Sequence, residues 1–173
     1  APGRALCAGQ LSGLKRMDST VFDILVYVFD HYLFADLPAG AERADIARDL
    51  ETAGFRGANV ERALDWLAEL ADGRDRPGVH ANDRAFRLYT DEESARLDAA
   101  CRGLLLALER GGILGATERE IVIERLLALD TEELDLEQVK WVVLMVLSCQ
   151  PGDTTACERM EELVYDLPVQ VPH

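Results

Sequence analysis

Apolar residues recur along most of the chain at the three- and four-residue spacing that places them on one face of an α-helix. The first run starts near residue 19 and ends before Pro38. Its apolar positions are Val21, Ile24, Leu25, Val28, Phe29 and Tyr32. Later runs predict helices over residues 42–53, 59–71, 91–110, 117–129, 135–148 and 155–167. The pattern therefore predicts an all-α protein of about seven helices.

Capping residues and glycines mark the expected starts and ends of these helices. A Ser or Thr followed three residues later by Glu forms a capping box, in which each residue satisfies a backbone N–H at the start of a helix. Glycine just past a helix favours its C-terminal stop. The expected starts are Thr90, Thr117, Asp135 and Thr155, and the expected stops are Gly54 and Gly111-Gly112.

One segment, Trp141 to Leu147, is apolar on every side. Seven residues are far fewer than the roughly 20 that cross a bilayer, so we expect no membrane span. The segment could be a buried strand, because several of its residues are β-branched. The capped entry at Asp135 and the apolar positions Val139 and Val143 favour a central helix instead.

The stretch from Ile46 to Leu70 has the outline of a helix-turn-helix: a short helix, a turn at Gly54 and an amphipathic helix. Phe86 to Tyr89 alternates and could form one short strand. Together they predict a winged-helix-like N-terminal lobe with at most one short β element, packed on a C-terminal helical lobe. The expected organisation is a non-native or misassigned leader at 1–16, a first lobe at 17–90 and a helical lobe at 91–173.

Charge limits the function classes. The chain has 18 Lys and Arg against 32 Asp and Glu, for a formal charge of -14. This charge argues against direct nucleic-acid binding, because phosphate contacts need a basic surface. The helix that would enter a DNA groove is itself acidic. Its candidate interaction residues are Asn59, Glu61, Arg62, Asp65 and Glu69.

No catalytic or metal-binding motif is present in the sequence. The cysteines (Cys7, Cys101, Cys149, Cys157) contain no C-x-x-C, and the histidines (His31, His80, His173) are far apart. Carboxylate pairs such as Glu132-Glu133 and Glu161-Glu162 are typical of a solvated helix face. We therefore expect that the protein is not an enzyme and has no catalytic residues, no metal and no cofactor. The cysteines are expected to be reduced. Cys101 and Cys149 lie among apolar residues, where a thiol is usually a small core residue.

Several segments together are similar to one family. They include A-G-F at 53–55, A-L-D-W-L-A-E-L-A-D at 63–72, R-L-Y-T-D-E-E-S-A-R-L-D at 87–98 and V-K-W-V-V-L-M-V-L at 139–147. In this order the chain resembles the bacterial Smg family from Met17 to about Asp166. The resemblance implies a small, cytoplasmic bacterial protein with no established activity or catalytic residues. It also implies a gene often found near those for a DNA-processing protein and topoisomerase I.

Three hypotheses for the function follow. The leading one is a non-catalytic protein–protein interaction or adaptor protein, whose acidic surface favours a partner with a basic surface. The alternative is a winged-helix-like DNA-binding regulator, and a weaker alternative is an enzyme with an unrecognised site. The sequence leaves the oligomeric state open.

Overall fold

The computed structural model describes residues 19–33, 43–72, 87–149 and 154–165. Two compact units make up the chain, Ala1–Leu64 and Asp65–His173. Their boundary falls inside the helix α3 (Gly57–Asp72). The lobes expected from the sequence divide the chain at a different point, after residue 90, and stay a prediction. The expected leader and the loop after residue 72 lie outside the described residues.

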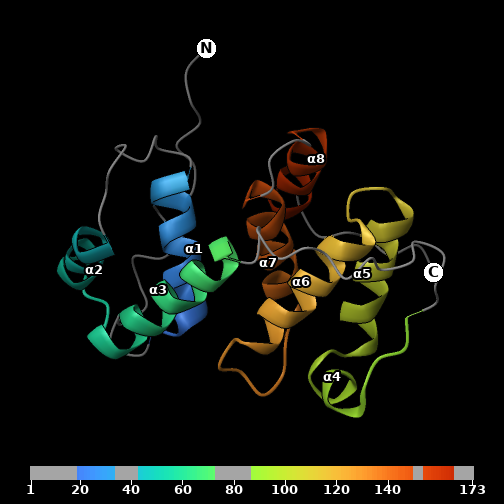
Figure 1. Ribbon diagram of the computed structural model, residues 1–173, viewed down its shortest axis with the longest axis horizontal. Coiled ribbons are helices and arrows are strands. Elements are labelled where there is room, and N and C mark those ends of the chain that lie inside the picture. The colour runs from blue at the N-terminus through green and yellow to red at the C-terminus, as the bar shows by residue number, and fades with distance from the viewer. Residues whose placement is uncertain (1–18, 34–42, 73–86, 150–153, 166–173) are drawn as a thin grey trace. The chain divides into compact units, whose positions relative to one another are not determined.

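The first unit is built from α1 (Val21–Val28), the π-helical turn η2 (Phe29–Leu33), α2 (Arg43–Thr52) and the first part of α3 (Figure 1). Thr20 caps α1 by accepting a hydrogen bond from the Asp23 backbone, and the Asp23 carboxylate accepts one from the Thr20 backbone. The predicted apolar face of the first helix is confirmed at Val21, Ile24, Leu25, Val28 and Phe29, which are buried.

Gly54 ends α2, as predicted. Its φ is +98°, a left-handed conformation that glycine adopts without steric cost. Its N–H donates to the carbonyl of Glu51, and the N–H of Phe55 donates to that of Leu50, which together form a Schellman motif. Helix, turn and helix thus follow one another here. The winged-helix detail is not confirmed, because residues 87–90 form no strand and Phe86 lies outside the described residues.

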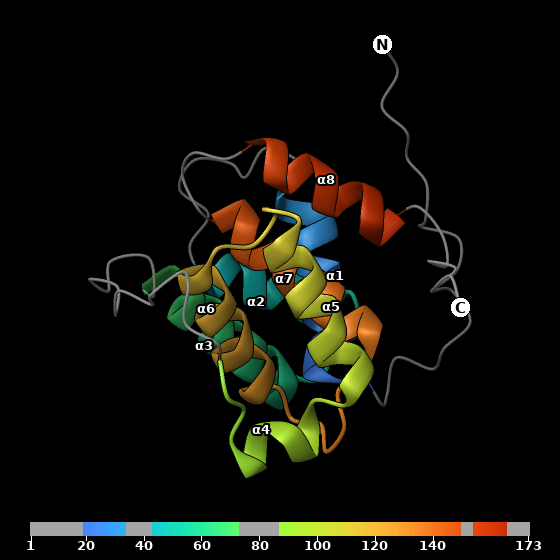
Figure 2. The ribbon, with the colours of Figure 1, turned by 90° about the vertical axis from the view of Figure 1, so that its right-hand side faces the viewer.

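The second unit contains the rest of α3 and five further helices. They are α4 (Asp91–Arg96), α5 (Ala99–Arg110), α6 (Ala116–Leu127), α7 (Leu136–Cys149) and α8 (Thr154–Tyr165). Helices α5, α6 and α8 pack against α7 (Figures 1 and 2). The described residues contain no strand, only one isolated bridge between Leu97 and Leu134. The prediction of an all-α fold is confirmed.

The central position of α7 is also confirmed. Its residues from Gln138 to Leu147 are buried except Trp141, and Val142, Val143 and Leu144 are fully inaccessible to solvent. Asp135 caps the helix as predicted: its carboxylate accepts from the Gln138 backbone at 2.8 Å. The 141–147 segment is therefore a buried helix and not a strand.

Three predicted boundaries are wrong. One is the start expected at Thr155, because α8 already begins at Thr154. The helix expected over 91–110 is broken at Leu97, whose backbone is extended and pairs with Leu134, and Asp98 then caps a new helix through the Cys101 backbone. The helix expected to start at Thr117 begins at Ala116, after Gly115, with no side-chain cap. Tertiary contacts override the local signal at Leu97.

We expect Leu144→Ala to lower the free energy of unfolding by about 2–5 kcal/mol, since it leaves a cavity in a core that relaxes only partly. The measurement is urea denaturation followed by circular dichroism. Leu88→Ala is the matched control, because Leu88 is 83% exposed and should cost less than about 0.5 kcal/mol. Equal effects of the two substitutions would contradict the placement of α7.

Candidate functional site

The interaction residues predicted on α3 fall on both sides of the unit boundary. In the first unit, the Asn59 side-chain amide donates to the carbonyl of Ser19 at 2.8 Å, and Glu61 pairs with Arg43 at 2.7 Å. Both contacts hold α3 to other segments of its own unit. Arg62 is exposed.

In the second unit, Glu69 pairs with Arg125 of α6 at 2.6 Å, while Asp65 is exposed. Trp66 donates from its indole N–H to the Arg125 carbonyl at 2.9 Å, and its ring lies below the Arg125 guanidinium. Asn59, Glu61 and Glu69 thus have structural contacts, and the interaction role of the α3 residues stays a prediction.

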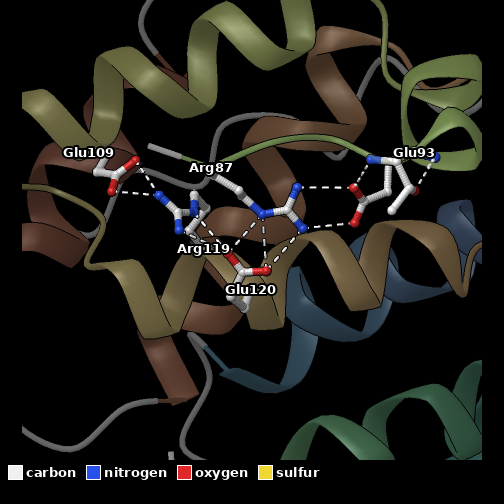
Figure 3. A network of polar contacts seen from close by, with 6 residues as sticks. Arg87, Glu93, Glu109, Arg119 and Glu120 are labelled. Atoms are coloured by element: carbon white, nitrogen blue, oxygen red, sulfur yellow. Dashed lines mark hydrogen bonds and ion pairs between the residues drawn. The ribbon is translucent and has the colours of Figure 1, made fainter. Parts of the chain in front are cut away.

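The largest group of charged side chains in the described residues lies elsewhere, at the junction of α4, α5 and α6 (Figure 3). Arg87 stands before α4 and binds two carboxylates. It donates to Glu93 at 2.7 and 3.0 Å and to Glu120 at 2.8, 2.9 and 3.0 Å. Arg119 completes the group by donating to Glu120 at 2.9 and 3.0 Å and to Glu109 at 2.6 and 2.7 Å. We call these five residues the Arg87 network.

Local structure places each member. Glu93 is the third residue of α4, where the Thr90 capping box holds its carboxylate against the Thr90 backbone N–H at 2.8 Å. Arg119 and Glu120 are adjacent on α6, and Glu109 is near the end of α5. The network therefore joins three helices through one pair of guanidinium groups, with the two-oxygen geometry that makes such pairs strong.

Burial and pairing shift the titration of these groups. Hydrogen bonds from Arg87 hold the pKa of Glu93 below its ordinary value, against the opposing effect of burial. Burial alone would raise the pKa of Glu120, but hydrogen bonds from Arg87 and Arg119 outweigh it and lower the pKa. Both carboxylates are therefore charged at neutral pH. The guanidinium groups that face them bind carboxylates of the protein itself.

Arg96 fixes the turn between α6 and α7 in a different way. Its guanidinium donates to three backbone carbonyls, those of Leu127, Leu129 and Thr131, at 2.6 to 2.7 Å. A cation at the end of a helix also interacts favourably with the helix dipole. Arg96 thus positions the turn that carries the exposed carboxylates Glu132 and Glu133. This pair lies between α6 and α7, in the gap between the helices predicted over 117–129 and 135–148.

Two thiols in the described part of the chain have a raised pKa. Burial raises the pKa of the Cys101 thiol to about 12, and the thiol donates to the Leu134 carbonyl. Burial also raises the pKa of Cys157. Cys101 is a core residue, as predicted, while Cys149 is half-buried.

The search for other sites can be stated for the described ranges only. No group of three or more His, Cys, Asp or Glu that could hold a metal ion occurs in them. No helix among them is long and apolar enough to cross a membrane.

Sequence reasoning missed the Arg87 network. The capping box identified Glu93, but nothing in the sequence relates Arg87 to Glu120, which is 33 residues away. A pairing of this kind depends on how α4 and α6 pack. A predicted contact map would be needed to find it.

Comparison with known proteins identifies the family. Residues 21–173 match a family described as "Protein of unknown function (DUF494)". A protein named Smg homolog from Alkalilimnicola ehrlichii is 44% identical over 157 residues, covering 91% of this chain and all of that relative. The chain belongs to the Smg family. Protein Smg of Pectobacterium carotovorum is 44% identical over 85% of this chain and 96% of its own length.

The resemblance seen in the sequence is thereby confirmed. A Smg homolog from Methylococcus capsulatus is 46% identical over 87% of this chain and 96% of its own length. No solved structure matches the chain. The names of these relatives state no activity, substrate or partner, so the function has to be argued from the residues.

We expect Arg87→Met to lower the free energy of unfolding by about 1–3 kcal/mol, because it removes the guanidinium that faces the partly buried Glu93 and leaves Glu120 with Arg119 as its one cation. Urea denaturation at pH 7 measures the change. Arg48→Met is the matched control. Arg48 pairs with Asp45 at 3.0 Å, but its side chain is 72% exposed, and loss of such a pair costs about 0–1 kcal/mol. Equal costs would mean that the network does not stabilise the fold.

The network also predicts a pH dependence. Glu93 and Glu120 have lower pKa values in the folded protein than their ordinary value of 4.5, so the unfolded chain binds more protons below that pH. Their contribution is complete above about pH 4.5 and is lost as the pH falls through the lowered values. Unfolding measured between about pH 3 and 6 should show a shallower acid decline for Arg87→Met than for the native chain. Parallel curves would contradict this origin.

Proposed function

We propose that this protein is a non-catalytic interaction or adaptor protein whose acidic surface binds a protein partner with a basic surface. The observation that carries the proposal is the burial of basic side chains in the second unit. Arg119, Arg125 and Lys140 are buried, and Arg87 and Arg96 are half-buried. Each of these side chains donates hydrogen bonds to carboxylates or carbonyls of the protein itself, so its positive charge is paired within the protein.

Carboxylates, in contrast, stay at the surface of the described part of this unit. Asp91 and Glu92 on α4, Glu132 and Glu133 in the turn before α7, and Glu162 on α8 are exposed. The exposed basic residues described there are Arg110 and Arg159. A surface with one dominant sign of charge accelerates encounter with a partner of the opposite sign and disfavours nucleic acid.

The second candidate, a DNA-binding regulator, rests on the first unit. Its helix-turn-helix carries four exposed arginines, namely Arg43, Arg48, Arg56 and Arg62. Against this, Arg43 and Arg48 each pair with a carboxylate of the same unit, and Glu61 lies on the helix that would enter the groove. An enzyme is the weakest candidate, because the thiols of Cys101 and Cys157 have raised pKa values and the sequence carries no recognised catalytic motif.

The test uses the tagged full chain as bait in a lysate of its own or a related bacterium, at about 0.05 M and 0.5 M salt. A protein partner that elutes at the higher salt supports the proposal. After identification, we expect Glu132→Gln with Glu133→Gln to slow its association about 3- to 10-fold by stopped-flow or surface plasmon resonance.

The matched control, Asp45→Asn with Glu51→Gln, has the same net charge but changes exposed carboxylates of the first unit. Equal slowing by both pairs would mean that net charge alone acts and would contradict a surface on the second unit. Recovery of DNA, with an affinity that falls steeply with salt, would favour the regulator instead.

A further inference from the structure

Residues 87–96 differ from the other described segments of the second unit because none of them is buried. They comprise α4 and the four residues before it, and α4 lies at one end of the unit (Figures 1 and 2). Every other helix described in this unit buries apolar side chains. A helix of six residues is marginal in water, because most helical stability in proteins comes from the packing of an apolar face. Polar contacts must therefore hold this segment in place.

Arg87 connects the segment to α6. Its guanidinium donates to Glu93 within the segment and to Glu120 of α6 at 2.8, 2.9 and 3.0 Å (Figure 3). The pair with Glu120 is open to water, since the Glu120 side chain is 43% exposed. Water that reaches an ion pair offers its charges replacement contacts, so separation of the pair costs less than it would inside a core. This attachment can therefore break while the rest of the unit stays folded.

Two further arginines complete the attachment. The Arg102 guanidinium of α5 donates to the Ser94 hydroxyl at 3.3 Å and faces the Tyr89 ring at 5.6 Å. Arg96 of α4 donates to carbonyls at the end of α6 at 2.6 and 2.7 Å. Detachment exchanges these hydrogen bonds for bonds to water, so the net cost of losing each one is small. Within residues 87–96, no buried apolar side chain has to leave the core.

The attached state also leaves two buried polar atoms unsatisfied. Among the described residues, the Nε of Arg96 and the Oγ1 of Thr131 are buried and form no hydrogen bond. A polar group in this situation has lost its contacts with water and gained nothing in exchange. The two residues are neighbours, since Arg96 donates through another nitrogen to the Thr131 carbonyl at 2.7 Å. Detachment returns both atoms to water, which lowers its cost.

The junction with α5 allows α4 to move alone. Leu97 follows α4 in an extended conformation and is fully buried. Asp98 then caps α5 by accepting from the Cys101 backbone at 2.7 Å, so α5 has its own start. Across the junction, the Leu134 N–H donates to the Arg96 carbonyl at 3.1 Å. This amide belongs to another segment, and it loses its acceptor when α4 detaches.

We propose that residues 87–96, here called the latch, detach from and return to the folded unit in one step, with Leu97 as the hinge. The helix α4 unwinds in the detached state, because it is too short to be stable alone. Detachment releases the carbonyls that Arg96 holds, so the turn before α7 loses one of its attachments. The latch thereby controls how firmly that turn is held. This inference does not depend on the acidic surface argued above.

Hydrogen exchange of the full chain tests the proposal, measured by NMR at several urea concentrations in which the protein stays native. The Ser94 amide, which donates to the Thr90 carbonyl at 2.9 Å, and the Leu134 amide are the two reporter amides. We expect their protection to agree within about 3-fold and to respond alike to urea, because one opening exposes both. After correction for intrinsic rates, both should exchange at least about 100-fold faster than the amides of Val142 and Val143 in α7.

Two conservative variants separate the latch from the rest of the fold. Glu120 and Glu109 both accept hydrogen bonds from Arg119, but of the two only Glu120 also binds Arg87 of the latch. Glu120→Gln weakens the attachment and should speed exchange of the reporter amides by about 3- to 10-fold. Glu109→Gln is the matched control, because it affects contacts that persist when the latch opens. It should leave the reporter amides unchanged, while α7 exchanges faster in both variants.

Three results would overturn the proposal. Reporter amides protected as strongly as those of α7 would mean that α4 detaches only when the whole unit unfolds. Equal acceleration of the reporter amides by Glu120→Gln and Glu109→Gln would mean the same. A Leu134 amide that stays protected while Ser94 exchanges would show that α4 frays alone, without release of the turn.

Discussion

The burial of α7 is the constraint on which the second unit depends. A helix with valine, leucine and methionine around its whole circumference is stable in water only when other helices cover it. α5, α6 and α8 each contribute an apolar stripe to that cover. Even Lys140, the one lysine described, is held at the surface of this core by Glu137 at 2.9 Å. The remaining features of the unit follow from how the covering helices are fixed in place.

Arginine does much of that fixing. The Arg87 network joins α4, α5 and α6, Arg125 joins α6 to α3 through Glu69 and Trp66, and Arg96 holds the turn that leads into α7. A guanidinium group has five donors in a rigid plane, so one side chain can bind two or three acceptors from different elements. The use of arginine inside the unit also removes positive charge from its surface. The same buried arginines therefore fix the packing of the helices and lower the positive charge at the surface of the unit.

Local signals in the sequence predicted the features that depend on neighbouring residues, namely the buried helix faces and several helix ends. The apolar spacing predicted the buried faces of α1 and α7. Gly54 indicated the end of α2, and the capping box of Thr90 and Glu93 indicated the start of α4. The break at Leu97 could not be found this way. The sequence from 91 to 110 is a good helix, and the break depends on pairing with Leu134, which is distant along the chain. The same holds for the candidate site, since each contact of Arg87 with Glu120 requires α6 to be in place.

The break at Leu97 matters for the surface as well as for the fold. If 91–110 were one straight helix, Leu97 could not be fully buried beside Leu134 while Arg96 reached the carbonyls that end α6. Because the chain bends there, α4 contributes no buried residue and is held by polar contacts of Glu93, Ser94 and Arg96. Its remaining carboxylates, Asp91 and Glu92, are thereby left at the surface. The exposure of these two carboxylates thus accompanies the attachment of α4 through polar contacts of Glu93, Ser94 and Arg96.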